Sequence, residues 1–166
     1  MNDDSKFCFW LKLNVGLITP KEIQTWADKK ILEDNNDQFV LDICYLKSDA
    51  EVKNYFNKLI RADLDIHDEQ LISINILKEY ISKKTPSNLD SGLNQYITDV
   101  ELICWHINDS DLTSLLYIYS DQINLAYQKV LTISVKEAFD EFSKHINEWL
   151  KRLFNIMVVI RNTLVY

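Results

Sequence analysis

Apolar residues recur every three or four positions along most of this chain, which is the spacing that places side chains on one face of an α-helix. The pattern is regular after Ser87, where one broad apolar stripe of helical spacing runs as follows: Leu89, Leu93, Tyr96, Ile97, Val100, Ile103, Cys104 and Ile107. The later segments 110–131 and 135–162 carry similar stripes. Each of these segments is therefore predicted to be a helix packed on one side.

Helix start signals precede these stripes. In Thr19-Pro20-Lys21-Glu22, the Thr hydroxyl can accept from the backbone of Glu22 while the Glu carboxylate bonds back, and proline suits the first helical position. Ser48 and Ser134 begin the same kind of motif, and Asp109 is a further capping candidate. Gly16 lies where the first helix is expected to end, because glycine tolerates the left-handed conformation that closes a helix.

These signals predict an all-α protein of about eight helices, an irregular multi-helix bundle or helical array. The expected helices are 5–15, 20–32, 37–47, 49–62, 68–83, 89–107, 110–131 and 135–162. We expect one domain, 1–166, which is an ordinary length for a single core. Segment 84–92 contains one proline and one glycine and is a possible boundary between two lobes, although a surface loop within one domain explains it as well.

Composition agrees with this fold class. The chain has two glycines and two prolines in 166 residues, and 47% of its residues are hydrophobic. So little glycine disfavours all-β folds and glycine-rich phosphate loops. The formal charge of −7 disfavours direct binding of nucleic acid, which requires clustered Lys and Arg.

Cysteine usage and hydropathy indicate a compartment. Cys8, Cys44 and Cys104 are widely spaced among apolar neighbours, which is typical of buried thiols in a reducing environment. The longest apolar run is far shorter than the roughly 20 residues needed to cross a bilayer. We therefore expect a cytoplasmic protein without a membrane partner.

Candidate chemistry is sparse. Glu141, His145 and Glu148 have the i, i+4, i+7 spacing that could place three metal ligands on one helix face, but a solvated helix face explains the spacing adequately. Cys104 and His106 are two residues apart, so on a helix they point away from each other. No nucleophile, nucleotide-binding or paired-histidine motif is present. We therefore predict no enzyme activity, no catalytic residues, no cofactor and no metal.

The charge is unevenly distributed. Segment 86–128 contains six acidic residues and no Lys or Arg, so it holds −6 of the total of −7. Trp105 and Tyr117 lie within it and off the apolar stripes, where exposure is expected. Such a surface suits a basic protein partner, because charge steers association and aromatic side chains supply binding energy. A solvated acidic surface that only aids solubility explains the segment equally well.

The segment 10–28 resembles the opening of small, acidic, all-helical immunity proteins of bacterial contact-dependent growth inhibition and polymorphic toxin systems. The matching elements are the aromatic-rich first helix, the turn Gly16-Leu17-Ile18-Thr19-Pro20, and Trp26-Ala27-Asp28 in the second helix. A weaker match continues through Leu41-Asp42-Ile43 and from Glu51-Val52 to Leu59. The resemblance implies a stoichiometric inhibitor of a toxin domain, often a nuclease, and implies no catalytic residues.

The expected function is that of an immunity protein which binds its cognate toxin domain and blocks the active site or substrate surface. A nuclease toxin presents Lys and Arg to phosphate, so an acidic inhibitor can complement it. The expected contact residues are Asp99, Glu101, Trp105, Asp109, Asp111, Tyr117 and Asp121. The alternative is a helical adaptor or regulatory module that uses the same surface without a toxin partner.

Overall fold

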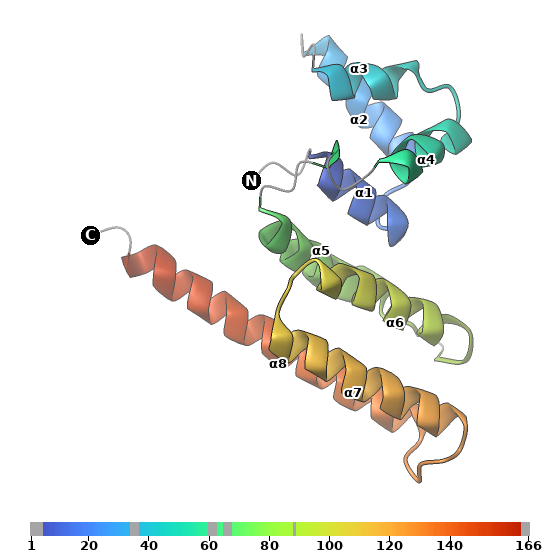
Figure 1. Cartoon of the computed structure of the whole chain (residues 1–166), viewed down its shortest axis with the longest axis vertical. Helices are drawn as coiled ribbons and strands as arrows, with labels where there is room; N and C mark the ends of the chain where they lie inside the picture. The colour runs from blue at the N-terminus through green and yellow to red at the C-terminus, as the bar shows by residue number, and fades with distance from the viewer. Residues whose placement is uncertain (1–4, 34–36, 60–62, 65–67, 88, 164–166) are drawn as a thin grey trace. The chain divides into compact units, whose positions relative to one another are not determined.

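The chain is described by a computed structural model that covers residues 5–33, 37–59, 63–64, 68–87 and 89–163, without the side chains of 90, 91 and 154–163. These residues form eight α-helices and no strand, so the predicted all-α class is confirmed (Figure 1). The helices are α1 (Lys6–Asn14), α2 (Pro20–Leu32), α3 (Gln38–Tyr45), α4 (Asp49–Lys58), α5 (Glu69–Lys84), α6 (Leu89–Trp105), α7 (Ser110–Tyr127) and α8 (Val135–Thr163).

Four helices, α2, α4, α7 and α8, begin directly after the predicted capping residues. Thr19 accepts from Glu22 N at 3.2 Å, and a Glu22 carboxylate oxygen accepts from Thr19 N at 2.8 Å, which completes a capping box at the start of α2. Ser134 and Glu137 make the same reciprocal pair before α8. Ser48 caps α4, although the Glu51 side chain accepts from Lys47 N. Each cap supplies acceptors to helix N–H groups that lack a partner within the helix.

Two helix ends show the left-handed closure. Gly16 has φ 66° after α1, and Leu17 N donates to the carbonyl of Lys12 at 2.8 Å. Lys129 has φ 57° after α7, and Val130 N donates to the carbonyl of Leu125 at 2.9 Å. This closure ends α7 at Tyr127, four residues earlier than the apolar stripe predicted. The expected end of the fourth helix, 60–62, lies outside the described residues; Leu59 is already extended, with ψ 128°.

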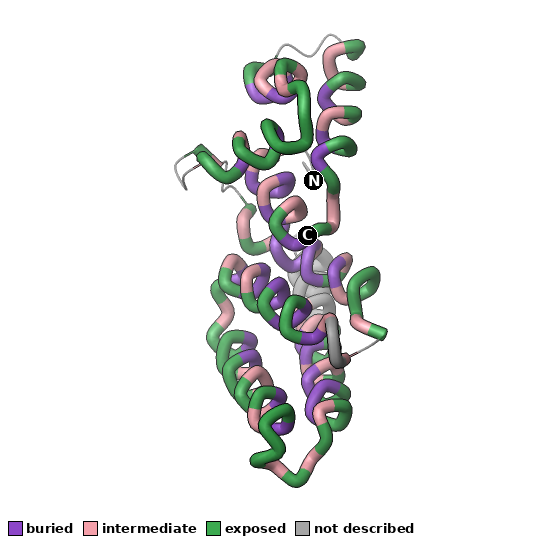
Figure 2. The backbone as a smooth tube through the Cα atoms, turned by 90° about the vertical axis from the view of Figure 1, so that its right-hand side faces the viewer, coloured by how far each residue is buried: buried purple, intermediate pink, exposed green. Residues whose placement is uncertain are grey.

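The chain divides into two compact units, Met1–Ile76 and Leu77–Tyr166. The division falls inside α5, whereas segment 84–92 lies within the second unit. Figure 2 shows buried positions recurring along individual helices and alternating with exposed ones. Each helix therefore buries one face, as the apolar periodicity predicted.

An aromatic cluster forms the core of the first unit. Phe9 of α1 packs against Trp26 of α2 with ring centroids 4.5 Å apart, and Phe39 of α3 meets Phe56 of α4 edge-on at 6.2 Å. Phe56 is fully buried. Complete burial of such a side chain contributes about 1.5–3 kcal/mol, so these contacts hold the four short helices together.

The second unit is built around the apolar face of α8. Phe139 meets Tyr96 of α6 edge-on at 5.6 Å, and Phe142 packs against Tyr119 of α7 at 6.1 Å. Phe142 is fully buried. By packing on both helices, α8 leaves the opposite sides of α6 and α7 facing outward. None of the helices described combines the length and apolar character needed to cross a bilayer.

Candidate partner-binding surface

The outward side of α6 carries an aromatic residue and a carboxylate in adjacent turns. Glu101 and Trp105 are spaced i, i+4 and are both exposed, together with Thr98 one turn earlier. The Trp105 side chain is 79% exposed, although indole is among the largest apolar groups a protein contains. An exposed tryptophan next to a carboxylate can contact an apolar group and a cation at once.

The outward side of α7 repeats this composition. At 3.6 residues per turn, Asp111, Tyr117, Ile118 and Asp121 fall within about one third of the helix circumference. All four are exposed, Tyr117 at 74% and Ile118 at 56%. The buried residues of α7, among them Leu112 and Ile123, lie on the other side.

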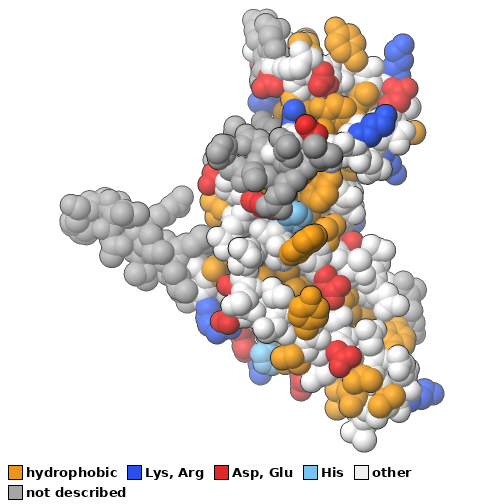
Figure 3. All heavy atoms as spheres, in the orientation of Figure 1, with side chains coloured by type: hydrophobic (Ala, Val, Ile, Leu, Met, Phe, Trp, Pro, Cys, Tyr) orange, Lys and Arg blue, Asp and Glu red, His pale blue; other side chains and the backbone are white. Residues whose placement is uncertain are grey.

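The two outward sides face the same direction. In Figure 1, α6 and α7 lie side by side, α6 in front of α5 and α7 in front of α8, and Figure 3 shows acidic and hydrophobic side chains interspersed over this side, with Lys and Arg at the margins. No Lys or Arg occurs in segment 86–128 to neutralise these carboxylates. We call this surface the α6–α7 face and define it by Glu101, Trp105, Asp111, Tyr117, Ile118 and Asp121.

Asp99 does not belong to the α6–α7 face, which differs from the sequence-based expectation. It is 7% exposed, and its two carboxylate oxygens accept from the Tyr80 hydroxyl at 2.7 Å and from the Gln95 amide at 2.8 Å. A buried carboxylate with both oxygens occupied cannot meet a partner. The sequence identified Asp99 as a candidate contact residue from its charge alone. Its burial depends on α5, because Tyr80 of that helix packs against it.

Asp109 also has a local structural role. One of its carboxylate oxygens accepts from Leu112 N at 2.8 Å, so the residue caps α7 as predicted and is only partly exposed. The side chain of Asp90 lies outside the part of the chain that is described.

Ile118 was not predicted as a surface residue. Its signal in the sequence is a position off the stripe formed by Leu112, Leu116 and Ile123.

The other candidate groups are the Cys104 thiol on α6 and the Glu141, His145 and Glu148 side chains on α8. His145 Nδ1 lies 2.8 Å from the carbonyl oxygen of Glu141 and 2.9 Å from the Tyr119 hydroxyl. Burial, followed by the charges of Glu141 and Glu148, raises the pKa of Tyr119. Burial likewise raises the pKa of the Cys104 thiol, which keeps it protonated. Within the described residues, no three His, Cys, Asp or Glu side chains form a group that could hold a metal ion.

Comparisons with protein-family models, curated proteins and solved structures gave no match.

Proposed function

We propose that this chain is an immunity protein that binds a toxin domain through the α6–α7 face and blocks its active site or substrate surface. The observation that carries the proposal is the exposure of Trp105 and Tyr117 among carboxylates on two helices without a single Lys or Arg. Residues 10–28 resemble immunity proteins, and from this resemblance we infer that the partner is a toxin domain.

The α6–α7 face exposes three large apolar side chains to solvent. Trp105, Tyr117 and Ile118 leave a large apolar area in water that a partner can cover. Removing apolar area from water contributes about 25 cal/mol per Å², and Trp and Tyr are the residues most often found to dominate protein interfaces. Burial of these three side chains therefore adds binding free energy to that from the charges of the face.

The carboxylates determine which partner fits. Glu101, Asp111 and Asp121 are exposed, and burying them against an apolar or acidic surface would leave them without counter-charges. A nuclease toxin must expose Lys and Arg to hold phosphate, so its substrate surface offers those counter-charges. An inhibitor that occupies this surface needs no chemistry of its own, only complementarity and a slow dissociation rate.

The decisive experiment is co-expression of this chain with the product of whichever gene neighbours its own, followed by co-purification and an assay of whether that product is toxic and is inhibited by this chain. We expect a stoichiometric complex, loss of toxin activity and rescue of growth. A complex that leaves the toxin fully active would reject the immunity role and favour a helical adaptor that uses the same face. Absence of any complex with that product would reject the proposed partner.

A further inference from the structure

Each helix of the α6–α7 face carries an aromatic residue and a carboxylate at the same spacing. Glu101 and Trp105 are four residues apart on α6, and Tyr117 and Asp121 are four residues apart on α7. All four side chains are exposed. Residues four apart on a helix are neighbours, with about 5–6 Å between their Cβ atoms. Each helix therefore presents one aromatic ring beside one carboxylate.

Neither pair is occupied by a cation from the part of the chain that is described. The ion pairs found there join lysines to Glu33 and Glu79, and the cation–π contact found there places Lys6 over the ring of Phe39. Segment 86–128 itself has no Lys or Arg. The two rings and the two carboxylates consequently keep their capacity to bind a cation from another molecule.

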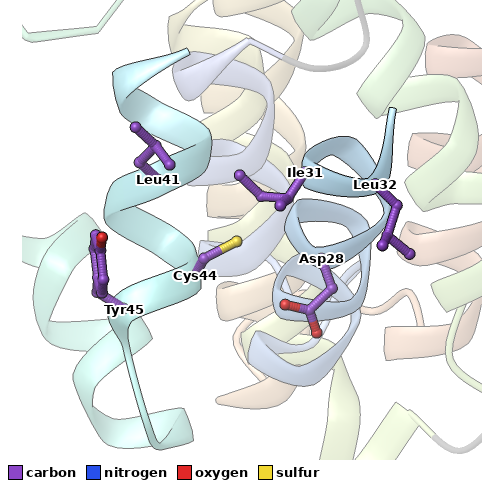
Figure 4. Close-up of a pocket in the computed structure, with 6 residues that line it drawn as sticks. All are labelled: Asp28, Ile31, Leu32, Leu41, Cys44 and Tyr45. Atoms are coloured by element: carbon purple, nitrogen blue, oxygen red, sulfur yellow. The ribbon is translucent and has the colours of Figure 1, made fainter. Parts of the chain in front are cut away.

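A hollow of about 430 Å³ between α2 and α3 differs from the α6–α7 face in both respects (Figure 4). Its carboxylate, Asp28, is followed directly by Lys29 and Lys30, so positive charge lies close to it. Its exposed apolar residues, Leu32 and Tyr45, lie on opposite outer sides of the two helices. The hollow therefore lacks the pairing of ring and carboxylate that α6 and α7 each provide.

A ring beside a carboxylate suits a guanidinium group better than an ammonium group. A guanidinium is planar, so it can stack on the ring while the N–H groups at its edge donate to the carboxylate. It is also less strongly hydrated than an ammonium, so it loses less on leaving water. An ammonium is attracted to the ring as a point charge but has no flat surface to stack on it. Stacking and edge hydrogen bonds together favour arginine over lysine.

A second copy of this chain does not fit the α6–α7 face. Two such faces placed together would bring Glu101, Asp111 and Asp121 opposite like charges, which costs binding free energy. The segment that carries these residues supplies no Lys or Arg in return. The charge of the face therefore requires a different protein as the occupant.

We propose that the α6–α7 face recognises two arginine side chains of its partner. One guanidinium stacks on Trp105 and donates to Glu101, and the other stacks on Tyr117 and donates to Asp121. This inference deepens the proposed function and rests on it for the identity of the partner as a toxin domain. It names the residue type that the partner must present, which charge complementarity alone leaves open between arginine and lysine.

Two synthetic peptides test the proposal on the full chain labelled with ¹⁵N. They have the same length and charge, and differ only in carrying arginines or lysines at every basic position, separated by glycine and serine. We expect both to shift the indole N–H signal of Trp105, with the arginine peptide bound about two- to five-fold more tightly, which is the range for a cation–π contact at an exposed site. Equal affinities, no detectable binding, or shifts confined to other parts of the chain would overturn the proposal.

Variants separate stacking from charge. Trp105→Leu and Tyr117→Leu keep an apolar side chain but remove a ring, so each should weaken the arginine peptide more than the lysine peptide, whereas Trp105→Phe should retain part of the preference. Because Trp105 and Tyr117 are mostly exposed, these variants are expected to fold normally. Tyr45→Leu removes a ring that is 76% exposed in the first unit and is the matched control, with an unchanged preference. A preference for arginine that survives both Trp105→Leu and Tyr117→Leu in full would also overturn the proposal.

The titration and the toxin experiment fail independently of each other. The peptides contain no toxin sequence, so a preference for arginine without any inhibited toxin would reject the immunity role alone. A toxin that this chain inhibits, combined with equal affinities for the two peptides, would reject only the recognition of arginine.

Discussion

The hydroxyl of Tyr80 donates a 2.7 Å hydrogen bond to the carboxylate of Asp99, which joins α5 to α6 inside the second unit. Both residues are buried, and the Gln95 amide donates to the other oxygen of Asp99. Burial and this contact raise the pKa of Tyr80 well above its usual range. One of the six acids of segment 86–128 therefore stabilises the fold and is not available to a partner.

Replacement of this phenol should destabilise the protein. Tyr80→Phe leaves the buried Asp99 carboxylate with one donor fewer, at an expected cost of about 1–3 kcal/mol in the free energy of unfolding. Urea denaturation measures it. Tyr55→Phe is the matched control, because Tyr55 is only partly buried and its hydroxyl reaches Asp42 at a longer 3.3 Å, so a smaller loss is expected. Equal losses in the two variants would contradict the role assigned to Tyr80.

The raised pKa of Tyr80 predicts that the free energy of unfolding falls at alkaline pH. A free tyrosine ionises near pH 10, so in the unfolded chain Tyr80 loses its proton from about that pH upward while the folded protein retains it. The unfolded state then binds fewer protons, and the stability contributed by Tyr80 is present below about pH 10 and is lost as the pH rises. In Tyr80→Phe, the urea midpoint should fall less steeply between about pH 9 and pH 11. Identical slopes in wild type and variant would contradict this assignment.

The lowered pKa of Glu137 predicts that the free energy of unfolding falls at acid pH. The backbone N–H of Ser134, and then its hydroxyl, donate to the Glu137 carboxylate and lower its pKa. This contribution is present above the usual pKa of about 4.3 and is lost as the pH falls through the lower folded value. Glu137→Gln should therefore make the urea midpoint less sensitive to pH between about 5 and 3. Asp140→Asn, at another exposed acid of α8, is the control and should retain the sensitivity.

The proposed function predicts how binding of a toxin domain through the α6–α7 face responds to substitution. Trp105→Ala and Tyr117→Ala should each weaken the complex about 30-fold if they are central anchors, with the free energy of unfolding changed by less than about 0.5 kcal/mol. The double charge reversal Glu101→Lys with Asp121→Lys should slow association about tenfold at low salt, and less at high salt. Calorimetry and stopped-flow fluorescence measure these effects.

A matched pair of reversals keeps this prediction specific. Asp140→Lys with Glu148→Lys makes the same change in net charge at exposed positions of α8, and should affect association much less. Equal effects of the two double variants would show that only total charge matters. Full affinity in Trp105→Ala and Tyr117→Ala would move the interface away from the α6–α7 face.

The left-handed residue after α7 predicts a stabilising substitution. Lys129 has φ 57°, a conformation that costs a side-chain-bearing residue about 1 kcal/mol and glycine much less. Lys129→Gly should raise the free energy of unfolding by up to that amount, measured as a higher urea midpoint at unchanged slope. Gln128→Gly is the control: at φ −77° glycine brings no relief, and only its entropy cost remains. A lower midpoint in Lys129→Gly would show that its side chain contributes more than the strain costs.

Local signals predicted the helices well because they act within a few residues. The capping pairs at Thr19 and Ser134 and the glycine at position 16 each satisfy backbone groups of their own helix, so no distant contact is needed to interpret them. The end of α7 was less predictable. Its apolar stripe continues beyond Tyr127. The residue in the left-handed conformation after the helix is Lys129 and not a glycine, so the sequence gives no signal of the helix end.

The sequence by itself determined the all-α class, the helix starts and the absence of bases from segment 86–128, since periodicity, capping and charge are properties of the chain alone. Only the tertiary structure decided which acids face solvent. Asp99 and Glu101 are two residues apart on α6, yet Tyr80 from α5 covers the first and leaves the second exposed. Which side of a helix is covered depends on residues distant in sequence, so burial could not be determined from local pattern.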